Sequence, residues 1–281
     1  MIRVFQIMVF SCTLTLLTGC GTPEKNEPIW EQIKIRDLAH SPDAKPPWGR
    51  LIKTINFVIH TFEIPAENIS ALDDIWQMLP GSHFAKNRKM GALYTKPLRF
   101  NDYNAFKANS FSVGFGRFRT LNKIADSLHN ADAKKVKTVS LLLPDGQARD
   151  LAIKRLDDEQ TIFYISTAGS MEGATVGQGK LALRIKAEKI PGSRGVCDVD
   201  IKPVFSSLIK SLIPRLTRKK SNDFLFTPLG FKLKMSPGDF VFIGPQKFIT
   251  HQITLDSLFF SRPKPRPLIR AYLIVCTRII D

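Results

Sequence analysis

The sequence predicts an α+β fold, in which a small strand-helix-strand-helix domain precedes a mainly antiparallel β domain. Three observations favour this class. Apolar and polar residues alternate in most structured segments, two segments in the first half carry apolar residues at helical spacing, and turns containing Gly or Pro separate the alternating segments of the last third. The chain has 281 residues, 43% of them hydrophobic, which is enough to bury one substantial core or two small ones.

The first domain is expected over residues 51–167. A strand over 55–64 leads to a helix that begins at Pro65, and a strand over 111–115 leads to a second helix with Thr120 as its predicted N-cap. Further strands are predicted over 139–143, 151–153 and 162–165. Together these segments indicate a small α+β unit.

The second domain is expected over residues 168–281. Strict alternation over 180–204, interrupted by a turn rich in Gly, predicts a β-hairpin. Apolar residues at helical spacing from 205 to 216 predict a short helix or, because of Pro214 and the basic cluster that follows, an irregular excursion. The segment 231–243 predicts two strands around a turn. The last segment, 268–280, is apolar on both faces, so we expect it to be a central strand of its sheet.

The first twenty residues contain a basic start, an uncharged apolar run and the tetrapeptide Leu17-Thr18-Gly19-Cys20. The run is shorter than the roughly 20 residues that a bilayer-spanning helix needs, and small residues precede the cysteine. This pattern resembles the lipobox of bacterial lipoproteins. The resemblance implies that residues 1–19 are a signal peptide, that Cys20 becomes the N-terminus and carries more than one lipid chain, palmitate-type acyl groups among them, and that the protein lies at the outer membrane facing the periplasm.

Composition adds a tether and a strongly basic balance. Residues 20–50 are rich in Pro and charged side chains, which predicts a flexible, partly extended linker. The formal charge is +16, or +15 without residues 1–19, because Arg3 is the only charged residue in that segment. In a cell envelope this balance favours anionic lipid or wall polymer as a partner, and export argues against nucleic acid.

Three clusters of basic residues are interleaved with Pro or lie in expected loops. They are Lys86, Arg88 and Lys89; Arg215, Arg218, Lys219 and Lys220; and Arg262, Lys264 and Arg266. Each cluster is either a solvated loop or a contact for an anionic membrane or polymer, and both interpretations stay open at this point.

Two cysteines lie beyond the expected signal peptide and lipid anchor. Cys197 and Cys276 would form a disulfide if they met in an oxidising compartment. The alternative is that each is buried separately as a small apolar side chain. The sequence leaves both possibilities open.

A search for chemistry finds no catalytic or metal-binding cluster in the sequence. The five histidines are widely separated, and His60 lies in an apolar strand, where a structural role is expected. Acidic pairs at 73–74, 157–158 and 198/200 are typical of solvated surface. Gly177-Gln178-Gly179-Lys180 lacks the spacing of a phosphate-binding loop and precedes a strand, not a helix. We therefore predict a non-enzymatic protein with no cofactor and no metal.

The last third also carries a family resemblance. An alternating hairpin over 180–204 is followed by the segment Met235 to Gly244, by Thr254-Leu255-Asp256-Ser257-Leu258-Phe259-Phe260, and by the apolar strand from Ala271 to Cys276. This order is similar to the C-terminal domain of bacterial secretins, although the proline of the family's final Thr-Pro-Arg-Ile is missing at Thr277-Arg278-Ile279. The whole chain is similar to uncharacterised lipoproteins of planctomycete-type bacteria.

The secretin resemblance implies a role in an envelope or secretion-type assembly, with protein partners. A basic binding module for anionic lipid or wall polymer is the alternative that the charge favours. An envelope hydrolase is a third possibility, for which the sequence offers no site residues.

Overall fold

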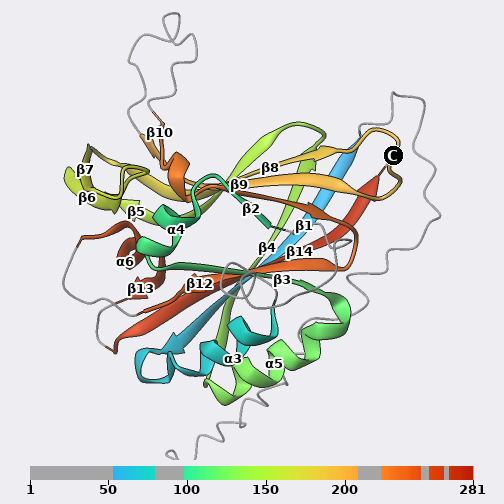
Figure 1. The fold of residues 1–281 in the computed structure, drawn as a ribbon, viewed down its shortest axis with the longest axis horizontal. Coiled ribbons are helices and arrows are strands. Elements are labelled where there is room, and N and C mark those ends of the chain that lie inside the picture. The colour runs from blue at the N-terminus through green and yellow to red at the C-terminus, as the bar shows by residue number, and fades with distance from the viewer. Residues whose placement is uncertain (1–52, 80–97, 208–222, 248–252, 263–265, 281) are drawn as a thin grey trace, which may run out of the picture. The chain divides into compact units, whose positions relative to one another are not determined.

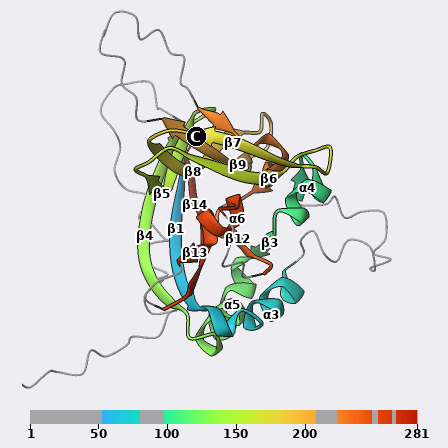
Figure 2. The same cartoon turned by 90° about the vertical axis from the view of Figure 1, so that its left-hand side faces the viewer.

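Two antiparallel sheets of six strands each face one another across the core (Figures 1 and 2). The computed structural model describes residues 53–79, 98–207, 223–247, 253–262 and 266–280. The predicted signal peptide, Cys20 and the tether over 20–50 lie outside these residues. Within the described part, strands account for most of the regular structure, in agreement with an α+β fold that is rich in β-strands.

The first sheet, which we call sheet A, has the spatial order β3-β12-β14-β1-β4, and β13 pairs with one end of β14. Its strands are β1 (Thr54–Pro65), β3 (Phe111–Arg117), β4 (Lys134–Pro144), β12 (Asp239–Pro245), β13 (Ser261–Arg262) and β14 (Leu268–Ile280). The last strand, β14, lies between β12 and β1, which confirms the central position predicted from its two apolar faces.

The second sheet, sheet B, has the order β2-β11-β9-β8-β5, and β10 pairs with β9. Its strands are β2 (Leu98–Phe100), β5 (Ala148–Leu156), β8 (Gly179–Lys189), β9 (Cys197–Ser207), β10 (Phe224–Leu225) and β11 (Phe231–Met235). The β8–β9 hairpin runs without a register shift, and its turn uses Gly192 and Gly195 at φ of 78° and 66°. Only glycine adopts this left-handed backbone at no steric cost, so the turn residues fix the register.

A separate hairpin of two strands, β6 (Gln160–Ile165) and β7 (Met171–Val176), lies beside the end of sheet B. The sequence predicts β6, but β7 was not predicted, because it has little apolar alternation and four of its six residues are exposed. A parallel bridge between Phe163 and Thr254 joins this hairpin to the start of α6.

Helices lie on one side of sheet A and in the space between the sheets. α3 (Ala71–Met78) and α5 (Leu121–Asn130) cover the face of sheet A that points away from sheet B (Figure 1). The rings of Trp76 in α3 and Phe242 in β12 are 5.3 Å apart between centroids, which fixes this helix layer to the sheet. α4 (Tyr103–Ala108) connects β2 to β3.

The short helix α6 (Leu255–Phe260) lies between the two sheets (Figure 2). Five of its six side chains are buried, and Phe259 and Phe260 pack with Phe111 at centroid distances of 5.7 and 4.8 Å. The Tyr272 hydroxyl donates a hydrogen bond of 2.9 Å to the Phe259 carbonyl oxygen. The core between the sheets is therefore strongly aromatic at this end.

Three expectations need correction. The expected boundary near residue 167 falls inside both sheets, since β1 pairs with β14, β3 with β12, and β5 with β8. The part of the predicted helix that begins at Phe205 is wrong, because Phe205 continues β9 and pairs with Leu181; the rest of that prediction, from 208 onward, lies outside the described residues. The Thr120 hydroxyl does not cap α5 but donates to the Arg117 carbonyl oxygen at 2.8 Å.

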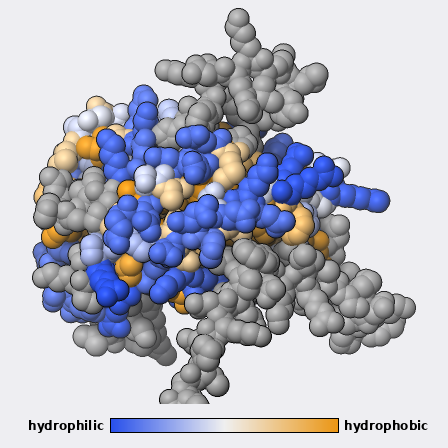
Figure 3. Space-filling model, turned by 90° about the horizontal axis from the view of Figure 1, so that it is seen from below, coloured by the Kyte–Doolittle hydropathy of each residue, from blue (hydrophilic) through white to orange (hydrophobic). Residues whose placement is uncertain are grey.

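The side of the molecule that carries α3 and α5 is mainly hydrophilic, and its hydrophobic residues form small separate patches (Figure 3). In the portion of the chain that the structure describes, no helix has the length and apolar character needed to cross a membrane. Polar surface on this side agrees with the predicted solvated acidic pair at Asp73 and Asp74, which are both exposed.

Candidate anion-binding cavity

A cavity of about 410 Å³ opens at one end of the space between the sheets. It is lined by Thr61 and Glu63 of β1, Val136 and Lys137 of β4, Leu151, Ala152 and Ile153 of β5, Arg262 of β13, and Arg270 and Tyr272 of β14. Strands of sheet A and the edge strand β5 of sheet B therefore meet around it. Elements from both halves of the chain are needed to build the site.

The register of β1 against β14 explains why charged groups lie here. Paired residues of antiparallel strands share a face, and Phe57 opposite Cys276 points into the core. Continuing in steps of two along the same face, the register brings Glu63 opposite Arg270. The inward face that is apolar over most of these strands thus ends in an ion pair at the mouth of the cavity.

The centre of the site is a carboxylate held by two guanidinium groups. Glu63 Oε1 accepts hydrogen bonds from Arg270 Nε at 3.0 Å and from Arg270 NH2 at 2.8 Å. Arg262 NH1 approaches both carboxylate oxygens at 3.4 Å. The Glu63 side chain is 10% exposed, that of Arg270 29% and that of Arg262 51%. Of the two guanidinium groups, that of Arg262 is therefore the more accessible to a molecule from solution.

The charges around the cavity do not balance. Three cations, Lys137, Arg262 and Arg270, face the single carboxylate of Glu63 among the lining residues. Lys154 adds to this surplus, because its position opposite Leu181 places it on the face of sheet B that looks toward sheet A. Desolvation lowers the pKa of Lys154, and repulsion from Arg270 lowers it further. Among the described residues around the cavity, positive charges outnumber negative ones, and a bound anion would compensate this surplus.

Apolar side chains form the other wall of the cavity. Leu151 is buried, Ile153 is half-buried, and Val136 is 50% exposed at the surface of β4. Tyr272 also lines the space, but its hydroxyl is committed to Phe259, and burial raises its pKa, so it offers no acid or base. The site combines cations with an apolar wall, and among its described lining residues no nucleophile is hydrogen-bonded to a base.

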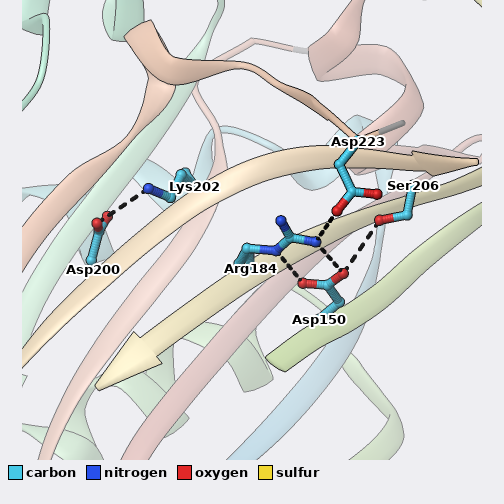
Figure 4. A network of polar contacts seen from close by, with 6 residues as sticks. All are labelled: Asp150, Arg184, Asp200, Lys202, Ser206 and Asp223. Carbon is cyan, nitrogen blue, oxygen red and sulfur yellow. Dashed lines mark hydrogen bonds and ion pairs between the residues drawn. The ribbon is translucent and has the colours of Figure 1, made fainter. Parts of the chain in front are cut away.

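A second group of charges, on the opposite face of sheet B, differs because its carboxylates, those of Asp150, Asp200 and Asp223, outnumber its cations, Arg184 and Lys202 (Figure 4). Arg184 Nε lies 2.7 Å from Asp150 Oδ1, and Arg184 NH2 lies 2.7 Å from Asp223 Oδ2. The Ser206 hydroxyl donates to Asp150 at 3.3 Å, and the hydrogen bond with Asp150 raises the pKa of Arg184. This network ties β5, β8 and the start of β10 together, and among the residues that the structure describes it leaves no surplus of positive charge for an anion.

A hollow of about 430 Å³ surrounds the turn between β8 and β9. Lys53, Lys189 and Arg194 line it with Asp145, whose Oδ1 accepts the backbone N–H of Lys189 at 2.7 Å. Its wall is mainly the turn from Ile190 to Arg194, whereas five strands from both sheets build the cavity at Glu63. We therefore take the cavity at Glu63 as the candidate site.

The predicted site residues fall in different places. Arg262 lines the cavity, and Arg266 is exposed but outside its lining. The structure does not describe Cys20 or the other predicted anionic-surface contacts, which are Arg215, Arg218, Lys219, Lys220 and Lys264.

The sequence patterns did not predict four charged residues at the cavity, which are Glu63, Lys137, Lys154 and Arg270. The available signal was a charged residue on the inward face of a strand that is otherwise apolar, at position 63 of β1 and 270 of β14.

Other residues singled out from the sequence take structural roles. His60 is buried, and its Nδ1 lies 3.0 Å from the Thr138 hydroxyl oxygen. Asp198 is exposed, and Asp200 pairs with Lys202 at 3.3 Å. Among the residues that the structure describes, no three His, Cys, Asp or Glu side chains gather closely enough to hold a metal ion.

Comparison with known proteins adds little to this geometry. No protein-family model matches the chain, and no curated protein matches it. A search of solved structures finds a weak similarity to the type IV competence pilus secretin PilQ of V. cholerae, with 11% identity, a TM-score of 0.23, and coverage of 88% of this chain and 64% of that chain. This chain thus spans less than two thirds of that secretin chain. That neighbour is a secretin, but a similarity at this level carries no argument about the function of this chain.

Proposed function

We propose that this chain is a non-enzymatic binding protein of the cell envelope, tethered through Cys20, that holds the phosphate of an anionic phospholipid headgroup in the cavity around Glu63, Arg262 and Arg270. The observation that carries the proposal is the surplus of positive charge in a cavity with one apolar wall. Guanidinium groups bind phosphate through paired, charge-assisted hydrogen bonds. Arginine fits this task better than lysine because its donors form a fixed fork.

The apolar wall favours a lipid over a soluble anion. Val136 and Ile153 lie beside the cations, so a ligand with a charged head and an apolar neighbouring part would satisfy both walls. Lys134 is exposed at the start of the edge strand β4, three residues before Lys137, and extends the positive potential outside the cavity. Juxtamembrane basic side chains contribute about 1 kcal/mol each to attraction by an anionic bilayer surface.

Vesicle flotation tests the proposal. The full chain with Cys20→Ser, which prevents lipid attachment at this residue, should float with phosphatidylglycerol vesicles more than with phosphatidylcholine vesicles. Arg262→Gln should reduce the difference, whereas Arg119→Gln should not. Arg119 is a matched control, because it is an exposed arginine in the 3₁₀ turn after β3, outside the cavity lining.

Competitors distinguish the source of the anion. Inorganic phosphate at millimolar concentration should not release the protein from phosphatidylglycerol vesicles, and neither should a soluble anionic wall polymer. Release by phosphate alone would indicate a site for small anions, and release by the polymer would favour wall binding. Equal flotation of the wild-type chain with both vesicle types would contradict the lipid proposal.

The anchor has its own test. Mass spectrometry of the protein recovered from membranes of a bacterial host should detect an N-terminal peptide that begins at Cys20 and carries a diacylglyceryl group. Recovery of an unmodified N-terminus upstream of Cys20 would contradict anchoring at this residue.

A further inference from the structure

The cysteines at positions 197 and 276 come from opposite sheets and meet in the core. Cys197 is the first residue of β9 in sheet B, and Cys276 lies near the end of β14 in sheet A. Both are buried, with 0% exposure, and both thiols are free in the structure. We propose that Cys197 and Cys276 form a disulfide that locks sheet A to sheet B when the protein folds in the presence of a disulfide oxidant.

The turn between β11 and β12 is the element that brings the two cysteines together. Cys197 pairs with Met235 at the end of β11, and its thiol donates to the Met235 carbonyl oxygen at 3.5 Å. The chain then crosses from sheet B to sheet A in a turn of Ser236 to Asp239, where the Gly238 N–H donates to the Cys276 carbonyl oxygen at 2.8 Å. The two cysteines are thus tied to opposite ends of one tight turn, and their thiols contact each other.

The environment determines when the bond can form. Contact with Cys197 and burial both raise the pKa of the Cys276 thiol, so Cys276 in the folded protein holds little of the reactive thiolate, and both sulfur atoms are buried away from an oxidant. Oxidation is therefore expected before the core closes. One thiolate attacks the oxidant disulfide and releases a first donor thiol, and the second cysteine attacks the mixed disulfide and releases another. Two protein thiols become one disulfide, and the oxidant disulfide becomes two thiols.

The disulfide would act at the end of the sheets that is remote from the candidate cavity. On β14, Cys276 and Arg270 are six residues apart, which corresponds to about 20 Å along a strand. The link would join strands whose cysteines lie 79 residues apart in the sequence (276 − 197). It would hold the sheets together at one end while the cavity stays open at the other.

Peptide mapping after refolding tests this inference. The wild-type full chain is refolded with oxidised glutathione, denatured in guanidinium chloride, alkylated with N-ethylmaleimide without reductant, and digested with trypsin. We expect the peptides 195–210 and 271–278 to be recovered as one linked species without maleimide, since cleavage after Lys202 is blocked by Pro203. Both peptides should carry maleimide only when reductant precedes alkylation.

Recovery of both peptides alkylated without reductant, or linkage of either to Cys12, Cys20 or glutathione in place of the other, would overturn the inference. Cys197→Ser provides the control, because it should free Cys276 for alkylation in guanidinium. A Cys197→Ala and Cys276→Ala double variant gives a second readout that does not depend on mapping. Reductant should lower the Tm of the oxidised wild-type protein and leave the Tm of the double variant unchanged.

Discussion

Replacing Glu63 with Gln distinguishes a binding site from a purely structural ion cluster. Glu63 is the internal counter-ion of Arg262 and Arg270, and any bound anion must share those guanidinium groups with it. Glu63→Gln keeps the side-chain shape and removes the negative charge. If the cavity binds anions, the variant should bind them more tightly than the wild-type protein, even though it loses stability.

The size of the gain follows from the geometry. Arg262 NH1 lies 3.4 Å from the Glu63 carboxylate. A charge-assisted hydrogen bond of about 2.8 Å from the same NH1 group, directed away from Glu63, would place an anion about 6 Å from the carboxylate. With an effective dielectric constant of about 40 at this partly exposed site, the repulsion between the two charges is about 1.4 kcal/mol. Removing it corresponds to about a tenfold lower Kd.

The same substitution should lower the free energy of unfolding by about 1–3 kcal/mol, because Arg262 and Arg270 lose the carboxylate that pairs with both. Urea denaturation measures this cost, and titration with a short-chain phosphatidylglycerol measures the affinity. Asp157→Asn is the matched control, since its ion pair with Arg155 is 2.8 Å long but 73% exposed on both sides. That control should change stability by less than about 0.5 kcal/mol. An unchanged or weaker affinity in Glu63→Gln would refute the reasoning.

Two further substitutions test the surroundings of the site and of the helix layer. Lys154→Met should raise the free energy of unfolding at neutral pH, because the lysine charge is partly desolvated and is repelled by Arg270. The gain should be only about 0.3 kcal/mol, since the side chain is exposed and water screens its charge. In urea denaturation this gain should shrink as the pH rises from the lowered pKa of Lys154 in the folded protein toward its unfolded value of 10.5, because the wild-type lysine then also becomes neutral. A gain that grows with pH would contradict this explanation. Gly114→Ala should cost about 1–3 kcal/mol, because the new Cβ would lie 2.5 Å from the Cβ of Leu79, an atom fixed to the backbone. Gly177→Ala, which meets nothing within 4 Å, should be close to neutral in the same thermal melts, and equal losses in the two variants would contradict the close-packing explanation.

Much of the local structure could be predicted from periodicity. The alternation over 180–204 fixed the faces of β8 and β9, and the apolar faces of 268–280 predicted that β14 is central. Glycines inside an alternating strand, as at 114 and 116, indicate close approach of another element, and a Cβ at either would collide with Leu79 or with the ring of Phe240. These features depend on neighbouring residues in the chain, so a single sequence carries them.

Strand partners and the candidate site could not be predicted in the same way. The alternation in β1 predicts which face of the strand is buried. It does not predict that the neighbouring strand is β14, more than 200 residues later in the sequence. The two-domain division failed for this reason. Glu63 and Arg270 attract notice only when the register places them opposite each other, and Lys154 joins them only through the packing of sheet B on sheet A.

The most direct measurement is an isothermal titration of the full chain with short-chain phosphatidylglycerol, set beside Arg262→Gln. Arg262 is half exposed, so its loss should disturb the fold little while removing one guanidinium from the cavity. We predict saturable binding of one lipid per chain, with an affinity at least about tenfold weaker in Arg262→Gln and unchanged in Arg119→Gln. The absence of saturable binding by the wild-type chain, or equal affinities in the wild-type chain and Arg262→Gln, would contradict the lipid-binding site.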